Sequence, residues 1–293
     1  MKEFTKDKMP EWCKDKNTNY NLLLSDDIDS FMCYILQKEL FNREIRSFID
    51  VNYKRLNKKS FGEQALYSLD NNIELDKTIG LDIALEKNIK CWDNHVTRYS
   101  NNDKYNLNSA NINTVFNIGY QNYTDKFVIS SFITMLSYYD VDISKWNKEQ
   151  LAILCAIDGV YVPFCNSRFK NQGRKNLQVL DYEFLANFIE ENLEYIIKIE
   201  NQYNLKHGKI WIDNNGYFNT NIDLLGLQLA FIGVFKTCFS LPNKQFKRIK
   251  SYKSAYIDFR NDKYTKDVLN ASNRMMNFTL IFKNKGVVSY DVD

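Results

Sequence analysis

The sequence lacks the signatures of several common enzyme classes. It has no glycine-rich phosphate-binding loop, no Gly-x-Ser-x-Gly nucleophile elbow and no kinase signature, which argues against P-loop and serine hydrolase chemistry. None of its six cysteines forms a Cys-x-x-Cys pair, so a structural zinc site is not expected. With only three prolines and ten glycines in 293 residues, the chain contains no low-complexity repeat or disordered linker of the usual composition.

Long hydrophobic runs and a strong charge bias are missing as well. No stretch reaches the roughly 20 apolar residues needed to cross a bilayer, and residues 1–8 have no apolar signal core. We therefore expect a cytoplasmic protein without membrane contact. The net charge of +3 is too small to indicate nucleic-acid binding by itself. A hydrophobic share of 44% in a chain of this length allows one large globular domain or two ordinary ones.

Strand-like and helix-like segments alternate in the first two thirds of the chain. Residues 21–24 are an apolar run typical of a buried strand, residues 30–41 carry apolar side chains at helical spacing, and residues 45–51 return to a strand pattern. This order predicts a right-handed parallel βαβ unit. Further strands are expected over 78–85 and 88–92, an irregular stretch over 160–176, and helices over 111–118, 126–139, 149–157 and 182–203.

The pattern changes after Asn204. Asn215 and Gly216 lie between two apolar runs and predict a hairpin. Beyond it we expect a helix over 224–239 and strands over 254–259 and 278–290. The whole pattern predicts an α/β fold in which a parallel sheet is flanked by helices. The expected parts are a loose polar lead-in (1–19), this α/β domain (20–203) and a smaller α+β C-terminal domain (204–293).

Aspartates stand where several of these apolar segments end. Carboxylates are costly to hold together unless a cation neutralises them, and ligands of open α/β sheets bind at the carboxyl ends of the strands. The pattern therefore predicts a metal-assisted phosphoester site. Two cations about 3.5–4 Å apart could clamp the attacking and leaving oxygens of such a reaction. The candidate residues are Asp27, Asp29, Asp82, Asp93, His95 and Asp158.

Simpler interpretations of two of these residues stay open at this point. Asp82 could cap the next element instead of binding metal, and His95 could be a structural or surface histidine. Only eleven residues separate Asp82 from Asp93, which is short for a connecting helix. Asp70 fits that spacing better but follows a weaker strand pattern.

In their order, these motifs resemble the DHH phosphoesterase superfamily. It includes nanoRNases, RecJ-type single-strand exonucleases, cyclic-dinucleotide phosphodiesterases and family II inorganic pyrophosphatases. The resemblance covers about residues 20–165 and implies a parallel α/β domain with a two-manganese site, followed by a substrate domain. It implies Mn²⁺ or Mg²⁺ ligands at Asp27, Asp29, Asp82 and Asp158. It also implies catalytic roles for Asp27, Asp29, Asp93 and His95, with His95 contacting phosphate.

The chain departs from the family pattern at two imidazole positions. Asn94 stands where the first histidine of the Asp-His-His triplet is usual, and no histidine precedes Asp27 between residues 22 and 26. An amide oxygen binds Mn²⁺ more weakly than an imidazole does. The loss leaves two outcomes, a carboxylate-rich site that suits Mg²⁺ or a degenerate site without activity.

Two basic clusters could serve a polyanionic ligand. The first lies shortly after Asp158 and could orient phosphate; it consists of Arg168, Lys170, Arg174 and Lys175. The second, residues 244–253, interleaves cations with aromatic side chains, as single-strand nucleic-acid surfaces do. The sequence thus favours a metal-dependent phosphoesterase acting on nucleotides or short single-stranded oligonucleotides. The alternative is a DHH-like protein that binds a nucleotide, a nucleic acid, a protein partner or a second copy of itself without hydrolysis.

Overall fold

A nine-stranded mixed sheet forms the centre of the molecule. The computed structural model describes residues 1–51, 62–99, 103–260 and 275–291. Within them the strand order is β10-β11-β9-β3-β2-β1-β4-β5-β6. The strands are β1 (Asn21–Leu24), β2 (Ile45–Asp50), β3 (Gly62–Ser68), β4 (Thr78–Leu81), β5 (Lys90–Trp92), β6 (Ser109–Ala110), β9 (Lys247–Asp258), β10 (Met275–Phe282) and β11 (Lys285–Tyr290).

The sheet has a parallel half and an antiparallel half. Strands β2, β1, β4, β5 and β6 pair in parallel. Strand β3 pairs antiparallel with β2 and β9, and β11 lies antiparallel between β9 and β10. The parallel core confirms the predicted α/β class. Because β9 is hydrogen-bonded to β3, the C-terminal strands continue the same sheet, and the boundary expected near 203–204 does not divide it.

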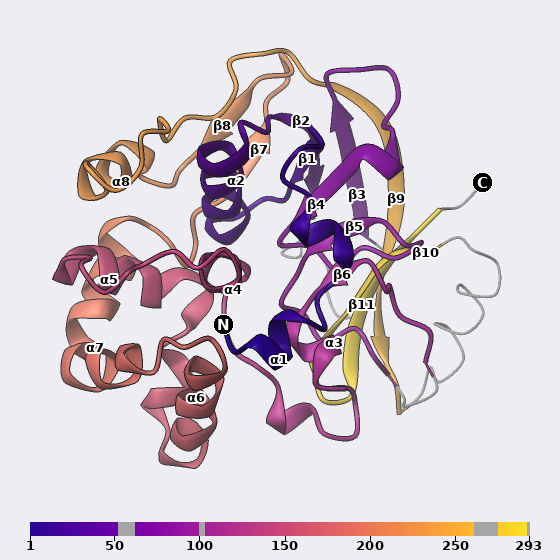
Figure 1. The fold of residues 1–293 in the computed structure, drawn as a ribbon. Coiled ribbons are helices and arrows are strands. Elements are labelled where there is room, and N and C mark those ends of the chain that lie inside the picture. The colour runs from indigo at the N-terminus through magenta and orange to yellow at the C-terminus, as the bar shows by residue number, and fades with distance from the viewer. Residues whose placement is uncertain (52–61, 100–102, 261–274, 292–293) are drawn as a thin grey trace.

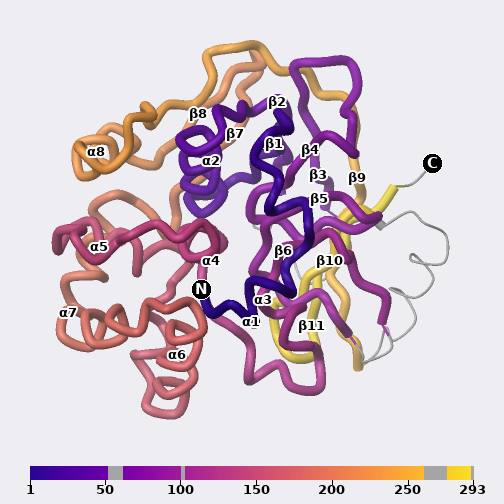
Figure 2. The backbone as a smooth tube through the Cα atoms, in the orientation of Figure 1, coloured from indigo at the N-terminus to yellow at the C-terminus, as the bar shows by residue number. Residues whose placement is uncertain are grey.

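The longer helices gather on one side of the sheet (Figures 1 and 2). Strand β1 shows how both faces are covered: Leu22 and Leu24 pack into the large core under the helices, and Leu23 packs on the opposite face. Bridges from Leu85 to Asn277 and from Val96 to Leu280 join β10 to the loops after β4 and β5. The helices are α1 (Glu3–Lys6), α2 (Ile28–Phe41), α3 (Ile112–Val115), α4 (Ser131–Tyr138), α5 (Lys148–Ala156), α6 (Ser167–Val179), α7 (Phe184–Gln202) and α8 (Leu224–Ala230).

The lead-in is not loose, which corrects the expectation for residues 1–19. Met9, Trp12 and Cys13 are buried in the main core. The ring of Trp12 packs edge-on against that of Trp92, with centroids 5.8 Å apart, and its indole nitrogen donates to the carbonyl of Asn108 at 2.9 Å. A few apolar residues in a polar stretch are thus enough to bury the segment.

Two segments of the chain differ from the predicted elements. The irregular stretch expected over 160–176 is wrong from residue 167 onward, because residues 167–179 form α6; the buried residues of this helix are Gly173, Asn176 and Leu177, and only one of them is a large apolar residue. The helix expected over 224–239 ends at Ala230, and Gly233 adopts a φ of +82° that a helix cannot continue. The hairpin is confirmed as β7 (Ile210–Ile212) paired with β8 (Phe218–Thr220). Across the described ranges, every helix is too short or too polar to cross a membrane.

Candidate functional site

The loop between β1 and α2 is fixed to the carboxyl end of β4. Asp27 is the N-cap of α2, and its Oδ1 accepts a hydrogen bond from the backbone N–H of Ser30 at 3.2 Å. The Ser30 hydroxyl donates to the carbonyl of Leu81 at 2.9 Å, and the Ser25 hydroxyl donates to that of Asp82 at 3.2 Å. Neighbouring parallel strands therefore bring Asp27, Asp29 and Asp82 to one edge of the sheet, as predicted.

One residue of α4 contacts two buried carboxylates. Asp29 is 2% exposed and Asp82 is 7% exposed. The backbone N–H of Ser131 donates to Asp29 at 2.6 Å, and the Ser131 hydroxyl donates to Asp82 at 2.8 Å. The second oxygen of Asp29 accepts the N–H of Phe132 at 2.8 Å. Asp29 thus binds the first turn of α4 with both oxygens, and a cation would have to share it with the helix.

Backbone strain accompanies two of the carboxylates. Asp82 has a φ of +48° and Asp158 a φ of +53°, both in the left-handed region that L-residues rarely adopt. Asp82 ends β4, and Asp158 lies just after α5 in a short 3₁₀ turn, η5 (Ile157–Gly159). Strained backbone of this kind gathers at functional sites, where the surrounding contacts impose it.

The carboxylates repel one another. Burial, together with the charges of Asp82, Asp158 and Asp27, raises the pKa of Asp29 well above its ordinary value. Burial and Asp27 do the same to the pKa of Asp82. Asp158 is exposed at the edge of the group, yet the protein around it displaces enough water to raise its pKa to about 6. The carboxylates of the site therefore lack a compensating positive charge, and a bound cation would supply it.

Asp93 orients His95 at the end of β5. Asp93 is 1% exposed, and its Oδ1 lies 2.7 Å from Nδ1 of His95. Its Oδ2 accepts from the side-chain amide of Asn111 at 2.6 Å, and the same amide donates to the His95 carbonyl at 2.7 Å. Burial alone would lower the pKa of His95, but Asp93, Asp82 and Asp158 raise it to about 10. His95 is thus an imidazolium at neutral pH whose ring is one-third exposed.

Asn94 contacts one of the candidate carboxylates directly. Its amide nitrogen donates to Oδ2 of Asp158. A histidine at this position could offer a nitrogen lone pair to a cation, whereas Asn94 uses its donor on a carboxylate. The Asn94 amide therefore holds a candidate ligand, Asp158, in place.

Lys209 also belongs to this site, although no sequence pattern indicates it. Its Nζ lies 3.0 Å from Oδ1 of Asp26, and the N–H of Ile210 donates to the Asp26 carbonyl at 2.9 Å. Burial would lower the pKa of Lys209, but Asp27 and Asp26 raise it. The pKa of Asp26 rises to about 6, since burial outweighs the attraction of Lys209. A separation of 183 residues leaves no local pattern from which this pair could have been found.

Some of these groups border a cavity of about 250 Å³, which we call the acidic recess, whereas Asp26, Asp82, Asp93 and His95 lie outside its lining. Its polar lining consists of Asp27, Asp29, Asp158, Glu200, Lys206 and Lys209. The structure thus gathers the predicted aspartates and His95. Asp70, the alternative to Asp82, pairs instead with Arg46 at 2.8 Å near the surface.

The predicted basic cluster does not line this recess. Lys170 and Arg174 both pair with Glu190, at 2.6 and 2.5 Å. The guanidinium of Arg168 lies 5.4 Å from the ring centre of Phe169, and Lys175 is exposed on α6. Two of the four cations are thus already neutralised within the protein.

The donor set has the chemistry that Mg²⁺ and Mn²⁺ prefer. Carboxylate oxygens suit both ions, and the raised pKa values of Asp29 and Asp82 show that neutralisation would be favourable there. In the described part of the chain, no three His, Cys, Asp or Glu side chains are arranged as a finished metal site. A bound cation would therefore have to draw the carboxylates closer together.

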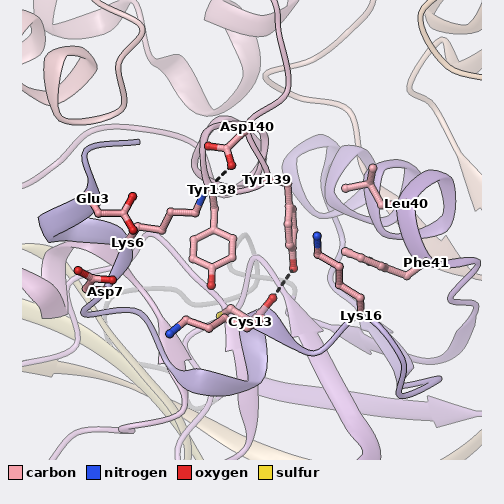
Figure 3. A pocket seen from close by; sticks show the side chains of 11 residues that line it. Glu3, Lys6, Asp7, Cys13, Lys16, Leu40, Phe41, Tyr138, Tyr139 and Asp140 are labelled. Carbon is pink, nitrogen blue, oxygen red and sulfur yellow. Dashed lines mark hydrogen bonds and ion pairs between the residues drawn. The ribbon is translucent and has the colours of Figure 1, made fainter.

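A larger recess lies at the opposite ends of α2 and α4. Its volume is about 420 Å³, and Figure 3 shows Tyr138, Tyr139 and Phe41 on its walls. Lys6 pairs with Asp140 at 2.6 Å across its rim, and the Tyr139 hydroxyl donates to the Cys13 carbonyl at 3.3 Å. It contains none of the predicted site residues.

Comparisons with known proteins leave the chain without an assigned family. No family model, no curated protein and no solved structure matches it.

Proposed function

We propose that this protein is a divalent-cation-dependent phosphoesterase that hydrolyses phosphodiesters of nucleotides or short single-stranded oligonucleotides. The observation that carries the proposal is the pair of buried carboxylates, Asp29 and Asp82, held by the same residue, Ser131. Asp27 and Asp158 stand within electrostatic reach of both. Buried, mutually repelling carboxylates beside a cavity are typical of functional sites.

Asp27, Asp29, Asp82 and Asp158 would hold the Mn²⁺ or Mg²⁺ ions, at one or two positions. When bound, such ions lower the pKa of water and neutralise the charge of a phosphate. His95, charged and oriented by Asp93, would donate a hydrogen bond to a phosphate oxygen. Lys209 would add positive charge on the other side of the recess.

Binding without hydrolysis is the second candidate, and Asn94 is the observation that favours it. Its amide contacts Asp158 where the family has an imidazole. A site with one weaker ligand could still bind a nucleotide, a nucleic acid or a protein partner while failing to activate water. Turnover separates the two candidates.

The test measures hydrolysis of bis(p-nitrophenyl) phosphate and of a dinucleotide with Mn²⁺ or Mg²⁺. The decisive variant is Asp82→Asn, because an asparagine oxygen still accepts the Ser131 hydroxyl and the fold is kept. The matched control is Asp70→Asn at a distant ion pair. Loss of a principal electrostatic group predicts a fall in turnover on the order of 10²–10³-fold for Asp82→Asn, with Asp70→Asn unchanged.

Cation binding is measured separately by thermal unfolding. At a cation concentration of about 100 times the dissociation constant, wild type should gain about 2.7 kcal/mol of stability. The Asp82→Asn variant should gain much less. A cation response without turnover would favour the binding protein. Equal turnover in Asp82→Asn and wild type would refute the proposed site.

A further inference from the structure

We propose that a second cavity beside the acidic recess, the side cavity, binds the aromatic base of a nucleotide whose phosphate lies in the recess. The inference rests on the proposed function, since it deepens the substrate class of the same site. The side cavity lies between the segment 123–128 and the start of α6, and its volume is about 570 Å³. That is within the range of small-molecule sites, roughly 300–1,000 Å³.

The two cavities meet at one side chain. Val162 lines both of them and is 50% exposed, so it forms an apolar ridge between the acidic recess and the side cavity. One ligand could therefore extend from one cavity into the other. The two ends of such a ligand would have to differ in chemistry. Charged groups border the acidic recess, whereas most residues that line the side cavity are uncharged.

The walls of the side cavity suit a flat apolar ring. Tyr123 and Phe169 contribute aromatic rings, and Val128 and Pro163 contribute aliphatic surface. Base–aromatic contacts tolerate any base, because every base has a π-face. The side-chain amides of Gln172 and Asn176 lie 3.1 Å apart and pair with each other on one wall of the cavity.

Lys126 joins the side cavity to the charged groups of the site. It lines the side cavity, and its charge lowers the pKa of Asp158 on the other side of the ridge. Its Nζ lies 3.2 Å from the Tyr123 hydroxyl. A cation in this position suits the phosphate of a ligand that crosses the ridge. A planar apolar group joined to a phosphate is the chemistry of a nucleotide.

The walls are held in place before any ligand arrives. The Tyr123 hydroxyl donates to the carbonyl of Leu280 at 3.4 Å, and the Gln172 amide donates to that of Asp125 at 3.0 Å. These bonds tie the 123–128 segment to β10 on one side and to α6 on the other. A preformed cavity avoids the cost of ordering its walls when the ligand binds.

The test compares adenosine 5′-monophosphate with ribose 5-phosphate, which has the same phosphate and no base. Dissociation constants are measured by calorimetry in the presence of Mg²⁺, for wild type, Phe169→Ala and the control Phe4→Ala, an exposed aromatic far from the cavity in sequence. Stacking of one base predicts that wild type prefers the nucleotide by roughly 5- to 100-fold. Phe169→Ala should bring this ratio close to one and leave ribose 5-phosphate binding unchanged.

A second variant keeps the test valid if Phe169→Ala loses its fold. Thr124 is exposed at the rim, so Thr124→Trp should block the side cavity without disturbing the core. It should reduce nucleotide binding and spare ribose 5-phosphate. The inference is overturned if a folded variant prefers the nucleotide over ribose 5-phosphate by the same ratio as wild type. It is also overturned if wild type binds neither compound at millimolar concentration.

The two proposals fail in different ways. One outcome is that cations stabilise the protein and turnover is present, but the base adds nothing to binding affinity. The side cavity is then not a base site, and the phosphoesterase proposal stands. If turnover is absent but the nucleotide preference depends on Phe169, the base site stands and the protein binds nucleotides without hydrolysing them.

Discussion

Replacing Asp29 by alanine should cost far more stability than replacing Asp27, although both are candidate cation ligands. In Asp29→Ala, the backbone N–H groups of Ser131 and Phe132 lose their acceptors at positions that are 1% and 0% exposed. Each unpaired buried donor costs about 1–3 kcal/mol. Relief of the repulsion with Asp82 offsets part of this, so we expect a net loss of about 2–4 kcal/mol. Asp27→Ala removes one N-cap bond of 3.2 Å, worth about 1 kcal/mol.

The assay is equilibrium unfolding in urea at neutral pH with EDTA, so that no cation contributes to stability. The unfolding free energy should depend equally steeply on urea concentration in all variants. The urea midpoint should be highest for wild type, lower for Asp27→Ala and lowest for Asp29→Ala. Asp158→Ala is the control for removing a site charge without removing a helix contact. If Asp29→Ala is as stable as Asp27→Ala, then Asp29 does not hold the first turn of α4 and the reasoning is wrong.

Three further predictions concern the frame of the site. Asn147→Ala removes the capping box with Gln150 at the start of α5 and should cost about 1 kcal/mol in urea unfolding, whereas the exposed Lys145→Ala should be neutral. Gly173→Ala would place a methyl group 2.8 Å from the ring of Phe164, and this crowding should outweigh the better helix propensity of alanine and lower the melting temperature; a rise would show that Phe164 yields. The hydrogen bonds that Asp15 accepts from Thr18 and Asn17 lower its pKa, so its stabilising effect is full above pH 4 and is lost as the pH falls further. The stability difference between wild type and Asp15→Asn should therefore shrink in acid unfolding below about pH 4, and a constant difference would contradict this assignment.

The parallel half of the sheet and its aspartates could be predicted because their signals are local. Residues 21–24 were expected as a strand, and β1 covers the same four residues. The alternation of the β1 side chains between the two faces of the sheet and the capping aspartate of α2 follow from a few neighbouring side chains. Once these strands are parallel and adjacent, the meeting of Asp29 with Asp82 follows from the geometry of the sheet.

The remaining parts depend on contacts between distant residues, which one sequence does not show. Ser131 joins Asp29 to Asp82 across more than 100 residues of chain, and Lys209 reaches Asp26 from the C-terminal third. Helix α6 was missed because its buried face consists of a glycine, an asparagine and a single leucine. Gly173 lets this face of the helix approach the ring of Phe164 closely, a contact that the sequence pattern does not show.

The insertion of β9 beside β3 also has a consequence for biosynthesis. Strand β3 ends at Ser68, and its partner β9 begins at Lys247, 179 residues later. At a synthesis rate of about 5–20 residues per second, the edge of β3 waits roughly 10–35 s for that partner on the ribosome. During this interval its backbone N–H and C=O groups are open to strands of other nascent chains. Slow translation or a truncated message would prolong the exposure, so the yield of folded protein should depend on how quickly residues 69–258 are made.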